Sequence, residues 1–297
     1  MKIQSIMLAG LLLLAQSCGH NAEVENNPGE AKAPVRVHVS DFAFTSEPFP
    51  DAQTRADVDP NSYSAVKAID IAIFAADKQV YAATQLKDVT TTYTTFGEFE
   101  CSLPMGTYTM VAVARNKGEG DVFTITSPTQ AAYTSDRARE TFCCTQNITV
   151  SSTEPVDISP VMSRVMARFQ LVSTDQMPSN AATIRTTYGA GSKSFNPTTG
   201  LATDDDGFTV TNTAHANTAG VLDVFSIVFL ATNEETMPVT VEALDANQKV
   251  LISKTLPAVH FKRNQITKAT GAMFTPGSSS FTFLLDTDWL PQENITF

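Results

Sequence analysis

The sequence predicts an all-β protein of two tandem antiparallel β-sandwich domains that follow an export signal. Short segments alternate between apolar and polar residues along most of the chain, and this period of two is typical of half-buried strands. Turn-forming residues separate these segments at the short spacing that is common in sandwich proteins. Hydrophobic residues make up 42% of the chain, and its length suits two domains of ordinary size, each with its own core.

Residues 1–17 have the features of a bacterial lipoprotein signal peptide. A positive N-terminal end precedes an apolar run from Ile6 to Ala15, which is too short to span a bilayer as a helix. Ala15-Gln16-Ser17 leads directly into Cys18, and we expect cleavage there and lipidation of the Cys18 thiol, with palmitate among the acyl chains. The alternative is an ordinary secretory signal followed by an unrelated cysteine.

Residues 18–34 are polar and acidic with almost no apolar side chain, so we expect a flexible tether between the lipid and the first domain. The net charge of −11 argues against nucleic acid or a phospholipid surface as the partner, because both attract basic faces. Lipid on Cys18 would instead hold the chain at the outer membrane and cell surface.

The first domain is predicted at residues 35–152 and begins with a strand at residues 35–44, in which Val35, Val37 and Val39 share one face. A polar, proline-containing break follows, and alternation returns in the next strand, where Ile69, Ile71 and Ile73 share one face.

Later in this domain, residues 96–103 and 107–114 are expected to pair as a hairpin across Pro104-Met105-Gly106. Residues 129–139 favour a helical turn, and the last strand of the domain should end near residue 150.

The second domain is predicted at residues 153–297, with the join between Thr153 and Pro160. Asp245-Ala-Asn-Gln has the composition of a hairpin turn. The alternating segments of this domain predict strands at residues 161–172, 182–188, 221–230, 239–244 and 250–256.

Three cysteines remain after Cys18, namely Cys101, Cys143 and Cys144. In an oxidising compartment a disulfide from Cys101 to one member of the vicinal pair would be stable. Three buried free thiols fit the sequence equally well, so both alternatives stay open.

The sequence has no enzyme signature, and we predict neither catalysis, cofactor nor metal. Zinc-protease, phosphate-loop, dinucleotide and nucleophile-elbow motifs do not occur. Asp204-Asp205-Asp206-Gly207 could offer oxygen ligands to Ca²⁺, but it lacks the spacing of an EF-hand loop, and an acidic turn is the simpler interpretation. The four histidines are scattered along the chain: His20, His38, His215 and His260.

Two further segments are candidates for a functional role, one in proteolysis and one in strand pairing. Arg55-Ala56 lies in the polar break after the first strand, where a protease could reach the backbone, although a plain surface arginine is the simpler reading. Beyond the Gly/Ser-rich residues 276–280, an apolar extended segment at residues 281–297 could complete its own sheet or add to a neighbour's sheet. Its apolar residues include Phe281, Phe283, Leu285, Trp289, Ile295 and Phe297.

Three segments resemble the fimbrillin and fimbrial-anchor superfamily of Bacteroidales surface fimbriae (type V pili). The resemblance includes their order after the lipoprotein cysteine and tether. They are residues 66–80, with Ala-Ile-Asp-Ile-Ala-Ile-Phe, residues 103–116, with Leu-Pro-Met-Gly-Thr-Tyr, and residues 261–267, Phe-Lys-Arg-Asn-Gln-Ile-Thr. The resemblance implies two transthyretin-like β-sandwiches and export as a lipoprotein. It also implies that an arginine-specific protease removes the tether and first strand, and that a neighbour's C-terminal strand refills the groove.

By position, Arg55 matches that cleavage site, residues 35–44 match the removed strand, and residues 281–297 match the donor strand. We therefore expect a stalk or tip subunit of a fimbria, with other fimbrial subunits, the outer membrane and a surface ligand as partners. The alternatives are a membrane-retained anchor subunit and a glycan-binding surface lipoprotein, which should expose a cluster of aromatic side chains.

Overall fold

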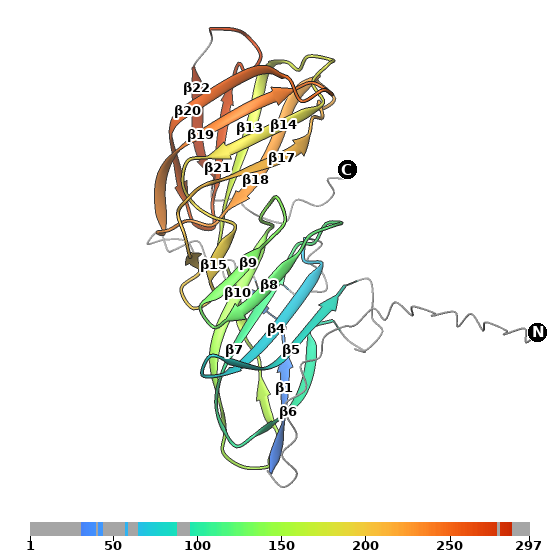
Figure 1. The fold of residues 1–297 in the computed structure, drawn as a ribbon, viewed down its shortest axis with the longest axis vertical. Coiled ribbons are helices and arrows are strands. Elements are labelled where there is room, and N and C mark those ends of the chain that lie inside the picture. Colours follow the sequence, from blue (N-terminus) through green and yellow to red (C-terminus); the bar gives the residue numbers. More distant parts are fainter. Residues whose placement is uncertain are drawn as a thin grey trace, which may run out of the picture.

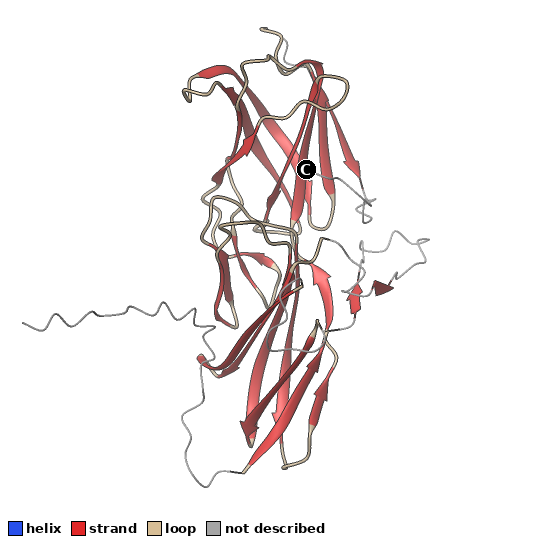
Figure 2. Ribbon diagram, turned by 90° about the vertical axis from the view of Figure 1, so that its right-hand side faces the viewer, coloured by secondary structure: helices blue, strands red, loops and turns tan. Residues whose placement is uncertain are grey.

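The computed structural model describes residues 31–39, 41–43, 57–58, 65–87, 96–277 and 280–286, and within them every regular element is a strand. Two β-sandwiches follow one another along the long axis of the molecule, with a small sheet between them (Figures 1 and 2). The predicted all-β sandwich fold is therefore confirmed. The described residues contain no helix with the length and apolar character needed to cross a membrane. The helical turn expected at residues 129–139 is wrong, because this stretch holds a short strand and bends.

The first sandwich consists of a three-stranded sheet, here called sheet A, and a seven-stranded sheet, here called sheet B. Sheet A has the order β11 (Val156–Ile158), β1 (Lys32–His38), β6 (Glu98–Pro104). Sheet B has the order β3 (Asp57–Val58), β2 (Asp41–Ala43), β12 (Val161–Arg164), β10 (Thr141–Val150), β7 (Gly106–Arg115), β4 (Ala68–Ala75), β5 (Lys78–Leu86).

The core of this sandwich contains the residues that the alternation placed on one face. Val35 and Val37 of β1 and Ile69, Ile71 and Ile73 of β4 are all at most 2% exposed and belong to one apolar cluster. Period-two burial explains why these segments form strands that close over a shared core.

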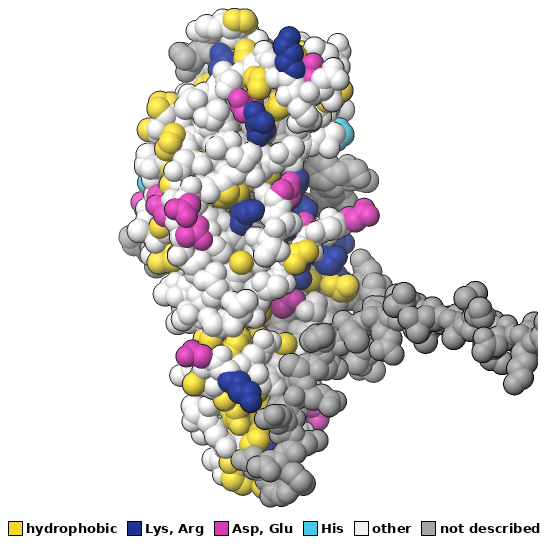
Figure 3. Space-filling view, viewed as in Figure 1, with side chains coloured by type: hydrophobic (Ala, Val, Ile, Leu, Met, Phe, Trp, Pro, Cys, Tyr) yellow, Lys and Arg dark blue, Asp and Glu magenta, His cyan; other side chains and the backbone are white. Residues whose placement is uncertain are grey.

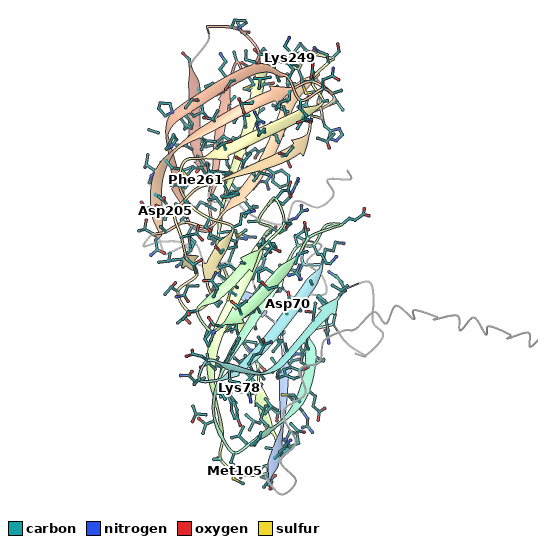
Figure 4. The ribbon with its side chains drawn as sticks, viewed as in Figure 1. Asp70, Lys78, Met105, Asp205, Lys249 and Phe261 are labelled. Atoms are coloured by element: carbon teal, nitrogen blue, oxygen red, sulfur yellow. The ribbon has the colours of Figure 1, made fainter. Side chains whose placement is uncertain are left out.

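The hairpin expected across Pro104-Met105-Gly106 is wrong. β6 pairs with β1 in sheet A, whereas β7 pairs with β4 and β10 in sheet B, so the connection crosses from one sheet to the other. Met105 marks this crossing at the end of the first sandwich that lies away from the second (Figure 4). Alternation shows which residues face the core, but it does not show to which sheet a strand belongs.

A small sheet, sheet C, covers the outer side of sheet B. It has the order β16 (Leu201–Ala202), β15 (Ser194–Asn196), β9 (Gln130–Tyr133), β8 (Phe123–Ser127), and so combines strands from both halves of the chain. A separate apolar cluster unites Phe74 and Val113 of sheet B, Phe195 of sheet C and Phe229 near the second sandwich. This cluster joins the two sandwiches.

The second sandwich packs a sheet D against a sheet E around a core that includes Phe169, Tyr188 and Phe261. Sheet D has the order β18 (Val221–Val228), β13 (Ala167–Gln176), β21 (Ile266–Gly271), β22 (Phe281–Asp286). Sheet E has the order β17 (Phe208–Thr213), β14 (Thr183–Tyr188), β19 (Glu234–Leu244), β20 (Val250–Lys262).

The join between the sandwiches lies later than the expected residues 153–160. β11 and β12 follow that position, yet they pair with β1, β2 and β10 in the first sandwich. The single strand expected at residues 161–172 is two strands, β12 and β13, which belong to different sandwiches. We therefore place the join after Arg164. The pairings β1–β11, β2–β12 and β13–β21 are parallel, so the sheets are not wholly antiparallel as predicted.

Candidate functional site: the strand slot of the first sandwich

The first strand of the chain, β1, fills a channel between β6 and β11, which we call the strand slot. β1 pairs antiparallel with β6 over its whole length, from Lys32 opposite Pro104 to His38 opposite Glu98. On its other side it runs parallel to β11, with Val35 opposite Val156. β1 is thus the central strand of sheet A, and without it β6 and β11 would have no common neighbour.

Apolar burial holds β1 in the slot. Ala33, Val35, Val37 and Val39 are between 0% and 2% exposed and point into the core of the first sandwich. Full burial of a valine side chain stabilises a fold by about 1.5–3 kcal/mol. The same four side chains would leave a deep apolar trough if the strand were withdrawn.

The outward face of β1 carries exposed ion pairs of Arg36 and His38. The Arg36 guanidinium lies 3.9 Å from a Glu100 carboxylate oxygen and 3.8 Å from one of Asp157, and His38 contacts Glu98. Surface pairs of this kind contribute little to stability. Burial and backbone pairing therefore hold the strand, while the slot is lined outside by acidic groups.

Beyond Val39 the chain passes from sheet A to sheet B, where β2 pairs parallel with β12. Phe42 is completely buried, and its ring centroid lies 4.8 Å from that of Phe142. Met162, which is also completely buried, is the residue directly opposite Phe42 on β12. We call the place that the Phe42 ring occupies against Phe142 and Met162 the Phe42 socket.

The socket adjoins the join between the sandwiches. The Arg164 guanidinium lies over the Phe142 ring at 5.0 Å, donates to a Glu140 carboxylate oxygen at 2.7 Å and donates to the Asn264 side-chain oxygen at 3.0 Å. Asn264 lies just before β21 in the second sandwich, so Arg164 ties both sandwiches to the wall of the socket.

The slot ends at a fixed turn before β6. The Val39 backbone N–H donates to the Gly97 carbonyl at 3.0 Å, and the Gly97 N–H donates to the buried Gln85 side-chain oxygen at 2.7 Å. Gly97 has a φ of +101°, and a Cβ there would lie 2.7 Å from the Val39 carbonyl oxygen. Only glycine fits this position, because it allows both the conformation and the close approach.

The three later cysteines are free thiols in the structure. Cys101 lies on β6 directly opposite Val35, and Cys101 and Cys144 both pack against the first core. Cys143 faces the opposite side of sheet B, where its thiol donates to the Pro197 carbonyl at 3.6 Å. Burial raises the pKa of the Cys143 thiol, and burial aided by the Glu100 carboxylate raises the pKa of Cys101 to about 12.

Cys101 should therefore report on whether the strand slot is filled. With a pKa near 12, about one Cys101 thiol in 10⁴ is ionised at pH 8, so iodoacetamide should alkylate it slowly in the intact chain. We expect the rate to rise at least about tenfold once the chain is cut between residues 44 and 56 and the fragment with β1 is removed. Mass spectrometry of the alkylated peptides measures the rate, and Cys143 serves as the control that should stay unreactive. Equal rates for Cys101 before and after removal would contradict this arrangement of the slot.

The C-terminal strand β22 lies at the edge of sheet D, where it pairs antiparallel with β21. Phe281, Phe283 and Leu285 alternate on one face of it, and Phe281 packs against Gly271 and the second core. However, Phe283 is 45% exposed and Leu285 is 38% exposed. β22 thus completes its own sheet with little burial, as an edge strand that could be released at low cost.

The Asp175 carboxylate accepts most of the hydrogen bonds that hold the segment before β22, and the Lys254 ammonium adds one to the Thr275 carbonyl at 3.0 Å. Asp175 accepts hydrogen bonds from the backbone N–H groups of Met273, Phe274 and Thr275 at 2.7–2.9 Å, and from the Thr275 hydroxyl at 2.9 Å. Burial alone would raise the pKa of the Asp175 carboxyl, but these hydrogen bonds outweigh it and hold the pKa below its usual value. Asp175 therefore fixes the chain up to Thr275, so that any movement of β22 begins after that residue.

We expect Asp175→Ala to loosen β22 without unfolding the second sandwich. Loss of hydrogen bonds to a charged group costs about 1–3 kcal/mol, so amide hydrogen exchange at residues 273–275 and in β22 should quicken roughly tenfold or more. The matched control is Asp245→Ala, which removes a carboxylate that accepts from Asn247 and Lys249 in the β19–β20 turn and should quicken exchange only there.

Because the folded pKa of Asp175 is lowered, its contribution to stability should be present above the unfolded pKa and lost as the pH falls through the folded pKa. Unchanged exchange in β22 would disprove the role of Asp175.

The remaining predicted site residues divide into two groups. Cys18, Arg55, Ala56, Trp289, Ile295 and Phe297 lie outside the described residues. The acidic turn at residues 204–207 is tied to its surroundings, with Asp204 accepting from the Ser194 hydroxyl at 2.7 Å and Asp205 from the Gly191 N–H. Within the described ranges no group of three or more His, Cys, Asp or Glu side chains is arranged to hold a metal ion.

The face of the molecule seen in Figure 3 mixes acidic and basic side chains without a large patch of either sign. Among the described residues, the large aromatic side chains that are well exposed are Phe225, at 39%, and Phe283, at 45%. They lie on β18 and β22, which are the two opposite edges of sheet D. Within the described part of the chain, the aromatic cluster expected of a glycan-binding face is therefore not found.

Comparisons with known proteins agree with this architecture. A family described as "Family of unknown function (DUF6562)" matches residues 34–290. None of the curated proteins matches the chain. A solved structure of a proposed adhesin from Bacteroides ovatus has a TM-score of 0.51 at 8% identity, and the match covers 84% of this chain and 88% of the other.

Two further solved structures are similar. A proposed polysaccharide-binding protein (DUF1812) from Bacteroides thetaiotaomicron has a TM-score of 0.50 at 11% identity, with 87% of this chain and 96% of the other covered. The fimbrial anchor protein Mfa2 from Porphyromonas gingivalis has a TM-score of 0.47 at 12% identity, with 86% and 99% covered. The two Bacteroides structures, with TM-scores of 0.51 and 0.50, confirm the fold expected from the resemblance to Bacteroidales surface proteins.

Proposed function

This chain belongs to the DUF6562 family, and we propose that it is a structural subunit of a cell-surface fimbria. In this proposal the chain is exported as a lipoprotein on Cys18 to the outer membrane. A protease then cuts after Arg55, and the strand slot is refilled by the C-terminal strand of a neighbouring subunit.

One observation carries the proposal. β1 and β2 precede Arg55 in the sequence, and every other described strand follows it. A single cut between Arg55 and Ala56 would therefore detach the central strand of sheet A and the strand that fills the Phe42 socket. The rest of both sandwiches would stay on one continuous chain.

The physical consequences of the cut favour assembly. An empty slot presents the unpaired edges of β6 and β11 and an apolar trough, which together form a template for an added strand. While β1 remains in place, this template is hidden, so subunits would not associate before they reach the cell surface. The weakly buried edge strand β22 offers an extended apolar segment for a neighbour's slot.

The fold that the chain shares with the proposed Bacteroides adhesin supports a surface role. The alternative among fimbrial subunits is an anchor subunit that keeps β1 and its lipid. Mass spectrometry of the chain taken from the outer surface of its own cells distinguishes an anchor from a stalk or tip subunit. A mature N-terminus at Ala56 is expected for a stalk or tip subunit. An N-terminus found only at acylated Cys18 would overturn the cleavage and leave the anchor role.

A further inference from the structure

We propose that the Phe42 socket couples the start of the chain to the join between the two sandwiches. With the Phe42 ring in the socket, Arg164 is held where it fastens the second sandwich to the first. When the socket is empty, this fastening is lost and the turn that carries Asn264 loosens. The inference goes beyond the proposed function, because it concerns any event that withdraws Phe42 and needs no occupant from another subunit.

The coupling begins at a ring that two groups share. The centroid of the Phe142 ring lies 4.8 Å from that of Phe42, and the Arg164 guanidinium lies 5.0 Å from the same Phe142 centroid. Phe42 and Phe142 are both completely buried, so a withdrawn Phe42 leaves an apolar void against the Phe142 ring. Neighbouring side chains relax partly into such a void. We therefore expect the Phe142 ring to move toward the void and away from the guanidinium.

Arg164 is a buried charge that depends on its partners. Its side chain is 1% exposed, and it donates to a Glu140 carboxylate oxygen at 2.7 Å and to the Asn264 side-chain oxygen at 3.0 Å. The face of an aromatic ring attracts a guanidinium, and most strongly where water is excluded. Once the Phe142 ring moves, water can reach the guanidinium, and a hydrated arginine no longer needs the bond to Asn264. The position of Arg164 thus depends on Phe142 and, through that ring, on Phe42.

Asn264 gives this loss a definite place in the second sandwich. Asn264 lies in the turn between β20 and β21 with a φ of +61°, and its backbone N–H donates to the Met166 carbonyl at 2.8 Å. Ile266, the first residue of β21, is directly opposite Asp286 of β22. The bond from Arg164 therefore fastens the turn from which β21 begins, and with it one end of the edge strand β22.

Other ties between the sandwiches do not involve the socket. Arg137 donates to the side-chain oxygen of Asn212, on β17 of sheet E, at 2.9 Å. Because this tie and the apolar cluster at sheet C remain when Phe42 is withdrawn, the two sandwiches should stay joined. Packed interfaces switch between discrete arrangements and do not deform continuously. We therefore expect loosening at residues 262–268, around Asn264, and little change in β17.

Amide hydrogen exchange of the full, uncut chain tests the coupling. We expect Phe42→Ala to quicken exchange at residues 262–268 about tenfold, as for loss of a hydrogen bond to a charged group. Phe42→Leu leaves a smaller void and should quicken it about two- to fourfold. The matched control is Leu103→Ala, which opens a void in the same core near Met105, at the end away from the second sandwich (Figure 4). With this control, exchange at residues 262–268 should stay within about twofold of the natural rate.

A double-variant cycle shows whether Phe42 acts through Asn264. Asn264→Gly removes the oxygen that accepts from Arg164 but suits the positive φ, and it should quicken exchange at residues 262–268 about tenfold. Adding Phe42→Ala to Asn264→Gly should raise the rate by no more than about twofold further. The matched control is Gln248→Gly, at another positive φ in a turn of the second sandwich, which should leave the effect of Phe42→Ala unchanged.

The coupling should also act in the reverse direction, because coupling free energies are reciprocal. Asn264→Gly should therefore quicken exchange at residues 41–43 of β2 at least about threefold, although the two sites lie in different sandwiches. Asn264→Asp, which keeps an oxygen for Arg164 to bind, should leave exchange in β2 near its natural rate.

Three results would overturn the proposal. In the first, the rates multiply to roughly a hundredfold rise in the double variant, which means that Phe42 and Asn264 act independently. In the second, exchange at residues 262–268 is unchanged in both Phe42→Ala and Phe42→Leu. In the third, Leu103→Ala quickens that exchange as much as Phe42→Ala does. Every variant is uncut, so these results leave the proposed cut after Arg55 to its own test.

Discussion

Val35→Asn is expected to lower the free energy of unfolding of the first sandwich by about 2.5–6 kcal/mol. The valine side chain is completely buried in the strand slot, and its loss costs about 1.5–3 kcal/mol. The new amide would be buried in apolar surroundings, which costs about 1–3 kcal/mol more. Denaturant unfolding of the uncut chain measures the change. The variant should also expose Cys101, which lies directly opposite residue 35.

The matched control is Arg36→Asn, one residue along the same strand. Arg36 is exposed and makes only ion pairs of 3.8–3.9 Å, so its replacement by the same residue should cost less than about 1 kcal/mol. Similar losses for the two variants would show that burial in the slot does not hold β1.

Arg164→Ala is expected to destabilise the protein by about 3–5 kcal/mol, because it removes one partner of a buried ion pair. The Arg164 side chain is 1% exposed, lies 2.7 Å from Glu140, and donates to Asn264 of the second sandwich. The change should also loosen the join between the sandwiches and the wall of the Phe42 socket. We expect faster amide exchange in β12 and around Asn264, together with an earlier denaturant midpoint.

Arg185→Ala provides the control for that prediction. Arg185 and Glu242 also lie 2.7 Å apart, but the Arg185 side chain is 37% exposed, so its loss should cost no more than about 1 kcal/mol. If both arginine variants lose the same stability, the join does not depend on the buried position of Arg164.

The sequence predicted which face of each strand is buried better than it predicted which strands pair with one another. Val35, Val37 and Val39 were expected on one face and are buried together, because a buried face requires alternation whatever its partner. The Asp245 turn was also predicted, since its carboxylate accepts from Asn247 and Lys249 within the turn itself. Both features depend on residues that are close in the sequence.

Features that depend on distant residues could not be predicted in this way. In the sequence, the crossing at Met105 resembles a hairpin, because its turn residues suit both a hairpin within one sheet and a crossing between two sheets. Only the pairing of β6 with β1, and of β7 with β4, shows that the chain crosses. β11 has three residues between polar and proline-rich stretches, so it carries little alternation to recognise. The Phe42 socket brings residue 42 against residues 142 and 162, and nothing local to Phe42 indicates those partners.

A single cross-link can show whether a second copy of the chain fills the strand slot. If the C-terminal strand of a neighbour fills the slot with Phe283 in the place of Val35, residue 283 lies directly opposite Cys101. Opposed residues on antiparallel strands have a Cα separation that a disulfide can span. The measurement is a non-reducing gel of the Phe283→Cys chain taken from the surface of its own cells. We expect a ladder of linked subunits that collapses on reduction. The ladder should be absent with Leu284→Cys and when Cys101→Ser is added to Phe283→Cys. Unlinked Phe283→Cys subunits, or a ladder with Leu284→Cys instead, would contradict the claim.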